Sequence, residues 1–160
     1  MSGLTEVRDA AANLLRASFP NLPRVEAFSG ELTLDAAARK SLPPGVSILV
    51  AAVAAENAAE GSTLDLDMAG TFGALVVSNN AAGPEYAELS ALAAAEKAAL
   101  AIHGSRFGLP DVSPAVVRSL ESVTDDELAG NGLSVWAVLW RQALTFTPEE
   151  ESGGISDESV

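Results

Sequence analysis

One stretch decides the fold: LSVWAVLWRQALTF, residues 133–146. Its side chains alternate between two sets, and a period of two is typical of a β-strand. One set is Ser134, Trp136, Val138, Trp140 and Gln142, and the other is Leu133, Val135, Ala137, Leu139, Arg141 and Ala143. Both sets are largely apolar in the first half of the stretch. This pattern predicts a strand covered on both faces, either centrally within its sheet or by a partner chain.

Two further long strands are predicted upstream. Val46–Ala54 follows the Pro-Pro-Gly turn at 43–45 and holds β-branched residues without a helical period, which predicts a buried central strand. From residue 63 to residue 77 an alternating segment continues into an apolar run, interrupted by Gly70 and Gly73. We expect one long strand there, bent or bulged at a glycine.

Three helices are expected. Apolar residues recur at helical spacing over Thr5–Ser18, and Phe19-Pro20 ends that helix. Thr33–Leu42 has Thr33 as an N-cap and three successive alanines. The third helix, Glu85–Ile102, opens after Pro84. Its expected buried stripe is Leu89, Leu92, Ala95, Ala99 and Ile102.

The remaining segments are short. Arg24–Phe28 is a strand candidate, and Ala115–Val123 reads as a strand or a short irregular segment. Residues 103–110 form a loop in which Gly104 is expected to cap the preceding helix. The polar residues 125–132 end in an Asn-Gly turn signal, and residues 56–62 are read as a loop.

The length and composition predict one α/β domain over residues 1–146. An apolar content of 48% is enough for a core, although aromatic residues reach only 5% and alanine dominates. Thr147–Val160 carries five acidic residues and a Gly-Gly pair, and it cannot bury enough surface to order itself. We therefore expect an acidic, disordered C-terminal tail at 147–160.

The charge balance limits the classes of partner. Nine Lys and Arg residues stand against 22 Asp and Glu residues, which gives a net charge of −13. Such a chain repels nucleic-acid phosphates and anionic membranes. The N-terminus lacks the apolar centre of a signal peptide, and the longest apolar run, Val46–Ala55, is about half of a spanning helix. We expect a soluble, non-secreted protein with no membrane partner.

The sequence offers few residues in an arrangement suited to catalysis or metal binding. The chain has no cysteine, which excludes a thiolate metal site and cysteine catalysis, and its one histidine, His103, stands alone near a helix C-terminus beside the expected cap Gly104. Asp65 and Asp67, with Glu60 upstream, alternate on a strand and read as a solvated edge rather than a cation site. The glycine-containing segments lack the order of a phosphate-binding loop, and Ser134 lacks a nucleophile elbow. We expect no catalytic residue, no cofactor and no metal.

Four residues are candidates for an interface. Trp136 and Trp140 lie on one face of the same strand, about 13 Å apart at roughly 3.3 Å per residue. Core packing under a helix and anchoring of a protein interface both account for such a pair. Arg106 and Phe107 stand between glycines in the loop after the long helix. They fit either a contact with a neighbouring subunit or a loop packed on its own domain.

The order of these elements resembles the Mu-like phage small tail protein family, which is similar to phage tail terminator (tail completion) proteins. The phrases that carry the resemblance are FSGEL at 28–32, the Pro-Pro-Gly turn, FGALVV at 72–77, HGSRFG at 103–108 and WAVLWRQ at 136–142. The resemblance covers residues 4–146. It implies an α+β domain with a mixed, mainly antiparallel sheet packed by two or three helices.

The resemblance also implies a function. A tail terminator is expected to assemble as a six-fold ring that caps the tail tube, stops its polymerisation and joins it to the head-neck. The implied partners are further copies of the chain, the tail-tube protein and a head-neck connector protein, while genomic DNA only passes through the lumen. The implied location is the virion tail, assembled in the host bacterial cytoplasm. An acidic bore would repel the passing DNA, which agrees with the charge of the chain.

Two alternatives stay open. One is another neck or head-completion protein of the same virion. The other is a small enzyme or ligand-binding α/β domain with a pocket at the strand ends, which the lack of convergent polar groups disfavours.

Overall fold

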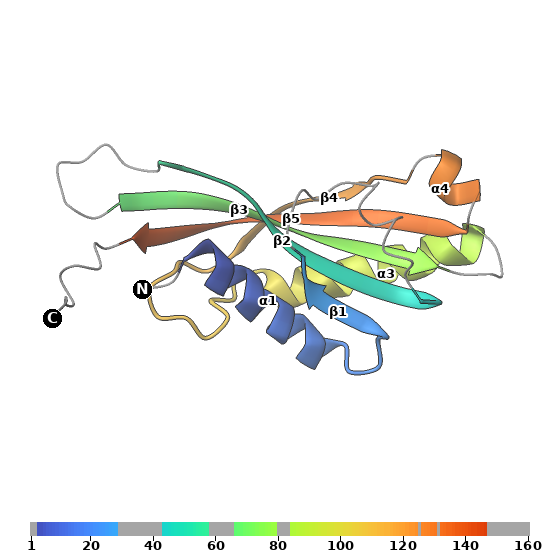
Figure 1. The fold of residues 1–160 in the computed structure, drawn as a ribbon, viewed down its shortest axis with the longest axis horizontal. Helices are drawn as coiled ribbons and strands as arrows, with labels where there is room; N and C mark the ends of the chain where they lie inside the picture. The colour runs from blue at the N-terminus through green and yellow to red at the C-terminus, as the bar shows by residue number, and fades with distance from the viewer. Residues whose placement is uncertain are drawn as a thin grey trace, which may run out of the picture.

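The computed structural model describes residues 3–28, 43–57, 66–79, 84–124, 126–130 and 132–146 of the 160-residue chain. In this part of the chain a five-stranded sheet carries two longer helices on one face and a short helix near one end of the other (Figure 1). The elements are α1 Leu4–Ser18, β1 Arg24–Ala27, β2 Gly45–Asn57, β3 Leu66–Asn79, α3 Pro84–Ile102, β4 Val116–Ser122, α4 Asp126–Gly130 and β5 Leu133–Phe146.

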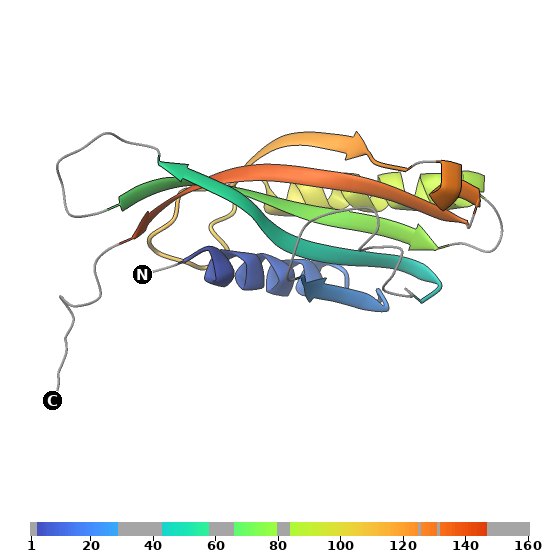
Figure 2. The same ribbon diagram turned by 45° about the horizontal axis from the view of Figure 1, so that its top comes forward.

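The strands lie in the order β1-β2-β3-β5-β4. Only β1 and β2 are parallel, and the other three pairs of neighbours are antiparallel. Figure 2 shows α1 lying along β1 and β2, whereas α3 lies along β5 and its neighbours β3 and β4. The expected fold class, an α+β fold with a mixed, mainly antiparallel sheet packed by helices, is confirmed.

The stretch from Leu133 to Phe146 forms β5 with the expected bounds. It lies between β3 and β4, so both of its backbone edges are paired. Val138 and Trp140 are fully buried on the face that α1 and α3 cover, while Val135 is fully buried on the opposite face. The prediction that the first half is covered on both faces is confirmed, and this chain's own elements provide the cover.

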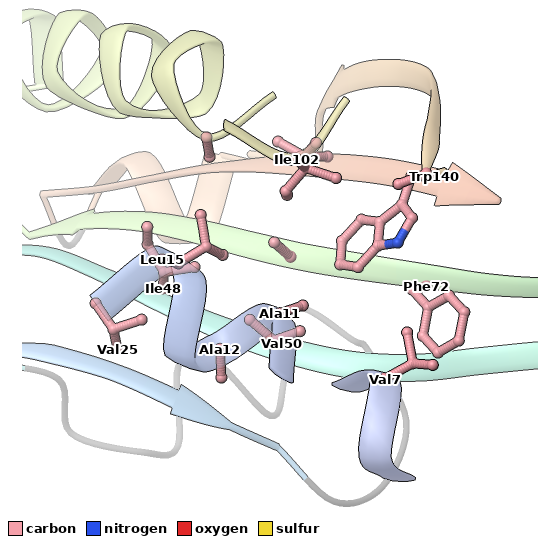
Figure 3. Close-up of a cluster of buried hydrophobic side chains, with 14 of the residues drawn as sticks. Val7, Ala11, Ala12, Leu15, Val25, Ile48, Val50, Phe72, Ile102 and Trp140 are labelled. Atoms are coloured by element: carbon pink, nitrogen blue, oxygen red, sulfur yellow. The ribbon is translucent and has the colours of Figure 1, made fainter. Parts of the chain in front are cut away.

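The core is split by the sheet. The larger part lies between the sheet and the two long helices, where the Trp140 ring faces Phe72 and the buried side of α1 (Figure 3). A smaller cluster lies on the other face, next to α4. It consists of Leu49, Leu75, Val77, Leu128, Val135 and Ala137. Among the described residues α4 is the helix on this face, and further along the strands Val116 and Ala143 are exposed.

Helix α1 follows its sequence pattern closely. Val7, Ala11 and Leu15 are fully buried against the sheet. The carboxylate of Glu6 accepts a hydrogen bond from the Gly3 backbone N–H at 2.9 Å, which satisfies a donor at the helix start. The helix ends at Ser18, before Phe19, as expected.

Helix α3 has the expected length but a different buried face. Its fully buried residues are Ala91, Ala95, Ala98 and Ile102. Leu89, expected inside, is 65% exposed, and Leu100 is 82% exposed. The expected stripe was therefore wrong at Leu89. The alanine side of the helix allows a close approach to the sheet, and this rotation turns the leucines outward.

The irregularity expected in β3 lies instead in its neighbour. The pairing of β2 with β3 shifts between Ala52 and Ala54, so the extra residue is Val53 in β2 and not a glycine of β3. Gly70 has another role. A Cβ at Gly70 would lie 2.8 Å from Cε2 of Phe72 and 3.0 Å from Cδ1 of Leu144, so the missing side chain makes room for these two.

The shorter elements agree with the sequence-based predictions in part. The strands at Arg24–Ala27 and Val116–Ser122 are confirmed, while α4, in the polar segment before the Asn-Gly turn signal, was not expected. Glu56 and Asn57, expected in a loop, belong to β2. The expected helix at Thr33–Leu42 and the expected tail at 147–160 lie outside the described residues.

Candidate functional site

The loop that follows α3 is built on left-handed backbone positions. Gly104, Phe107 and Gly108 have φ angles of +84°, +56° and +77°. The loop is tied to the start of β4, because the Gly104 N–H donates to the Ala115 carbonyl at 2.8 Å and the Ala115 N–H donates to the Ser105 carbonyl at 2.8 Å. Gly104 thus takes the conformation expected of a helix C-cap.

Phe107 packs onto its own domain. Its ring meets the Trp140 ring edge-on, with 6.2 Å between centroids, and Trp140 stacks on Phe72 at 5.6 Å. The Phe107 N–H donates to the Ser105 hydroxyl at 3.0 Å, which holds the residue at its positive φ. Arg106 next to it is exposed. The loop therefore directs its aromatic residue inward and leaves its cation at the surface.

The two tryptophans share the helix-covered face of β5, as expected. Trp140 is fully buried, and its Nε1–H donates to the Gln142 side-chain oxygen at 3.1 Å. Trp136 is half-buried, and its Nε1–H donates to the Glu88 carboxylate of α3 at 3.0 Å. The same carboxylate accepts from the Ser134 hydroxyl at 2.7 Å. Trp140 thus has no surface to offer a partner, as the core-packing alternative expected, and Trp136 joins α3 to the sheet.

His103 and the acidic candidates do not converge. The Nδ1 atom of His103 accepts a hydrogen bond from the Val117 N–H at 3.1 Å, at the edge of β4. The Asp67 carboxylate accepts from the Thr145 hydroxyl at 2.9 Å. Glu60 and Asp65 lie outside the described residues. In the part of the chain that the structure describes, no three His, Asp or Glu side chains gather in a way that could hold a metal ion.

A hollow with two arginines lies on the open half of the sheet, on the face opposite Trp140. Its volume is about 250 Å³. It is lined by Ala69, Ser113, Val116, Arg118, Arg141, Gln142 and Ala143. We call it the arginine hollow. Val116 pairs with Arg141 across β4 and β5, so the two side chains share this face, and Val116 is 45% exposed.

The charges of the arginine hollow are only partly satisfied. Arg141 forms an ion pair with Glu56 at 3.3 Å, and both side chains are substantially exposed. Arg118 is exposed, and within the described residues its guanidinium has neither an ion pair nor a side-chain hydrogen bond. The arginine hollow can therefore accept a carboxylate, with an apolar contact available at Val116.

A second surface feature lies on α3. Leu89, Ala93, Glu96 and Leu100 are all exposed and follow each other at spacings of four, three and four residues. We call them the outer stripe of α3. Sequence reasoning missed this stripe because it placed leucine inside by hydrophobicity. The signal in the sequence was the run of alanines, because alanines can form the helix face that packs on the sheet just as leucines can.

A larger hollow of about 470 Å³ lies between the end of α1 and β1. Its two arginines are occupied: Arg16 donates to the Val25 carbonyl at 2.7 Å, and Arg24 pairs with Glu26 at 3.5 Å. No described helix combines the length and apolar character needed to cross a bilayer.

The comparisons with known proteins show the fold. No protein-family model and no curated protein sequence matches the chain. Among solved structures, a chain of the "virion of native gene transfer agent (GTA) particle" is similar, with a TM-score of 0.53 and 14% sequence identity. The match covers 91% of this chain and 100% of that chain. At this identity the likeness shows a shared fold.

Proposed function

We propose that this chain is a structural protein of a phage-type virion, and specifically a tail terminator. The observation that carries the proposal is the fold shared with a chain of a gene transfer agent virion, matched over that chain's full length. The family resemblance of residues 4–146 points to the same class of particle. As a tail terminator, the protein forms a hexameric ring that caps the tail tube and joins it to the head-neck.

The surface of the molecule supports assembly rather than catalysis. Large apolar side chains are exposed on both sides of the sheet: Leu89 and Leu100 on α3, and Val53 and Val116 on β2 and β4. Exposed apolar side chains that gather on a surface are typical of protein interfaces. The buried Gln142 is engaged within the fold, because its amide donates to the Ser113 carbonyl at 2.9 Å.

The charge of the chain suits a conduit for DNA. A net charge of −13 per copy, repeated around a ring, repels the phosphates of DNA in the lumen. The DNA passes without being held. The specific partners are then the tail-tube protein on one side and a head-neck connector protein on the other, in the virion tail, with assembly in the host bacterial cytoplasm.

The test is assembly on the tail tube. The purified chain is mixed with the tail-tube protein of the same virus, and the particles are measured by light scattering and negative-stain microscopy. We expect a six-fold ring at tube ends and shorter tubes as the ratio of this chain rises. A chain that leaves tube length unchanged and stays monomeric would refute the proposal. Binding to the head connector alone would identify another neck or head-completion protein instead.

A further inference from the structure

The two exposed apolar surfaces lie on opposite sides of the sheet. The outer stripe of α3 projects away from the helix-covered face, and the arginine hollow opens on the other face. The stripe is apolar at Leu89 and Leu100, which are 65% and 82% exposed, and it is acidic between them at Glu96. The hollow is apolar at Val116 and basic at Arg118 and Arg141. The two surfaces therefore carry opposite charges, and each also presents an exposed apolar side chain.

The charges that would meet are available. Within the described residues, neither Glu96 of the stripe nor Arg118 of the hollow has an ion pair or a side-chain hydrogen bond. Both side chains are exposed. A carboxylate and a guanidinium form paired hydrogen bonds when they meet, and this fixes the register of a contact as well as its sign.

The dimensions of the two surfaces also agree. The stripe runs over 12 residues of helix from Leu89 to Leu100, and the 11 steps between them span about 16 Å at 1.5 Å per residue. β4 has seven residues, about 20 Å at its full length, and forms the edge of the sheet beside the hollow. A helix laid along β4 would cover this edge and place an apolar residue of the stripe near Val116.

We infer that the outer stripe of α3 in one copy docks on the arginine hollow of the next copy, with Leu100 against Val116 and Glu96 against Arg118. This inference rests on the proposed function and gives the ring its subunit contact. The two surfaces differ and lie on opposite faces, so the contact is head-to-tail and each copy uses both surfaces. Head-to-tail contacts build a closed ring when the rotations from each copy to the next add up to a full turn. A symmetric dimer contact uses the same surface on both copies and cannot be extended in this way.

The absence of cysteine from the sequence makes the contact directly testable. Two variants, Leu100→Cys and Val116→Cys, each carry a single thiol at an exposed position. They are assembled on tail-tube protein, oxidised and run on a non-reducing gel. We expect no disulfide in either variant alone, because a head-to-tail contact does not bring identical positions together. A mixture of the two should give a cross-linked dimer, and the double variant should give a ladder that ends at the ring size.

A matched control and a charge reversal complete the test. Leu66→Cys, at a position 43% exposed at the start of β3 and outside the outer stripe of α3, should not cross-link to Val116→Cys. Arg118→Glu should raise the concentration needed for ring formation at least tenfold, and the double variant Glu96→Arg/Arg118→Glu should recover most of that loss. Circular dichroism confirms that each variant is folded.

The outcomes separate this inference from the proposed function. Rings that form normally without the Leu100–Val116 cross-link, or with Arg118→Glu having no effect, would overturn the subunit contact while the tail-terminator proposal stands. Variants that form rings but no longer bind the tube would show that the surface faces the tube protein, and this too would overturn the contact. A native chain that forms no ring even on tubes would refute the proposed function itself.

Discussion

Replacing Phe107 by alanine should destabilise the folded domain. The Phe107 ring meets Trp140 edge-on at 6.2 Å and belongs to the cluster between the sheet and the helices. A fully buried Phe→Ala change costs about 3–5 kcal/mol. Phe107 is half-buried, so we expect about 2 kcal/mol, part of which is the aromatic pair itself. For a chain of this length this lowers Tm by about 4–8 °C.

A glycine variant separates the ring from the backbone. Phe107 has a φ of +56°, and an L-residue in that region costs about 1–2 kcal/mol. Glycine avoids this cost but adds entropy to the unfolded chain, which offsets about 0.4–1 kcal/mol. Phe107→Gly should therefore be about 0.5–1 kcal/mol more stable than Phe107→Ala, although both lose the same ring.

The assay is urea unfolding followed by tryptophan fluorescence, with Arg106→Ala as the control. Arg106 is exposed, and its loss should change the free energy of unfolding by less than about 0.5 kcal/mol. If Phe107→Ala were as stable as the native chain, the packing argument would be refuted. If that stable variant also failed to assemble, Phe107 would be an interface residue instead.

Further changes test the packing at Gly70, the contribution of the C-terminal residues and the role of His103. Gly70→Ala should lower the free energy of unfolding by about 1 kcal/mol, because overpacking costs about 1–3 kcal/mol while replacing a strand glycine stabilises by about 0.5–1 kcal/mol. A second change, Phe72→Leu, should relieve part of this loss. If the effects of the two changes were strictly additive, the close contact between these positions would be contradicted. Deleting Thr147–Val160 should leave Tm within about 5 °C, and a larger fall in a melting scan would mean that the tail docks. EDTA and His103→Ala should change neither Tm nor assembly, whereas stoichiometric metal, or lost assembly in a folded His103→Ala protein, would bring the enzyme hypothesis back.

The long strands were predictable because their signal is local. β5 is rich in β-branched and aromatic residues that are apolar on both faces in its first half, and β2 is a largely apolar segment that follows a Pro-Pro-Gly turn. In such segments hydrophobic pattern, β-propensity and turn residues all favour the same structure. Helix α1 was predictable for the same reason, since its apolar residues fall on one face.

The buried face of α3 was not predictable from hydrophobicity. The helix is apolar nearly all round, so its sequence does not say which side meets the sheet. The choice depends on how closely the backbone can approach β5, and Ala95 and Ala98 permit a closer approach than Leu89 would. That is a property of the packed pair of elements and not of the helix alone.

The arginine hollow was equally hidden in the sequence. Arg118 and Arg141 are 23 residues apart, in strands separated by a helix and a turn. Only the register that pairs Val116 with Arg141 brings them to one surface. The bulge that interrupts this pairing between Val117 and Ser119 frees Arg118 from the ladder. A single-residue shift in register would have turned Arg141 to the opposite face of the sheet.

One proposed subunit contact contributes little binding free energy, and this predicts that the ring forms on the tube rather than in solution. Burying a leucine is worth about 1.5–3 kcal/mol, so Leu89 and Leu100, already partly covered, contribute about 2–4 kcal/mol together. Bringing two free copies together costs about 4–15 kcal/mol, so pairs should be rare at micromolar concentration. On a tube end the copies are held side by side at an effective concentration in the millimolar range, and closing the ring adds a final contact without a further loss of freedom. The chain should therefore sediment as a monomer when alone and as a ring when tubes are added. Rings that persist at micromolar concentration without tubes would show that the contact is larger than these two leucines.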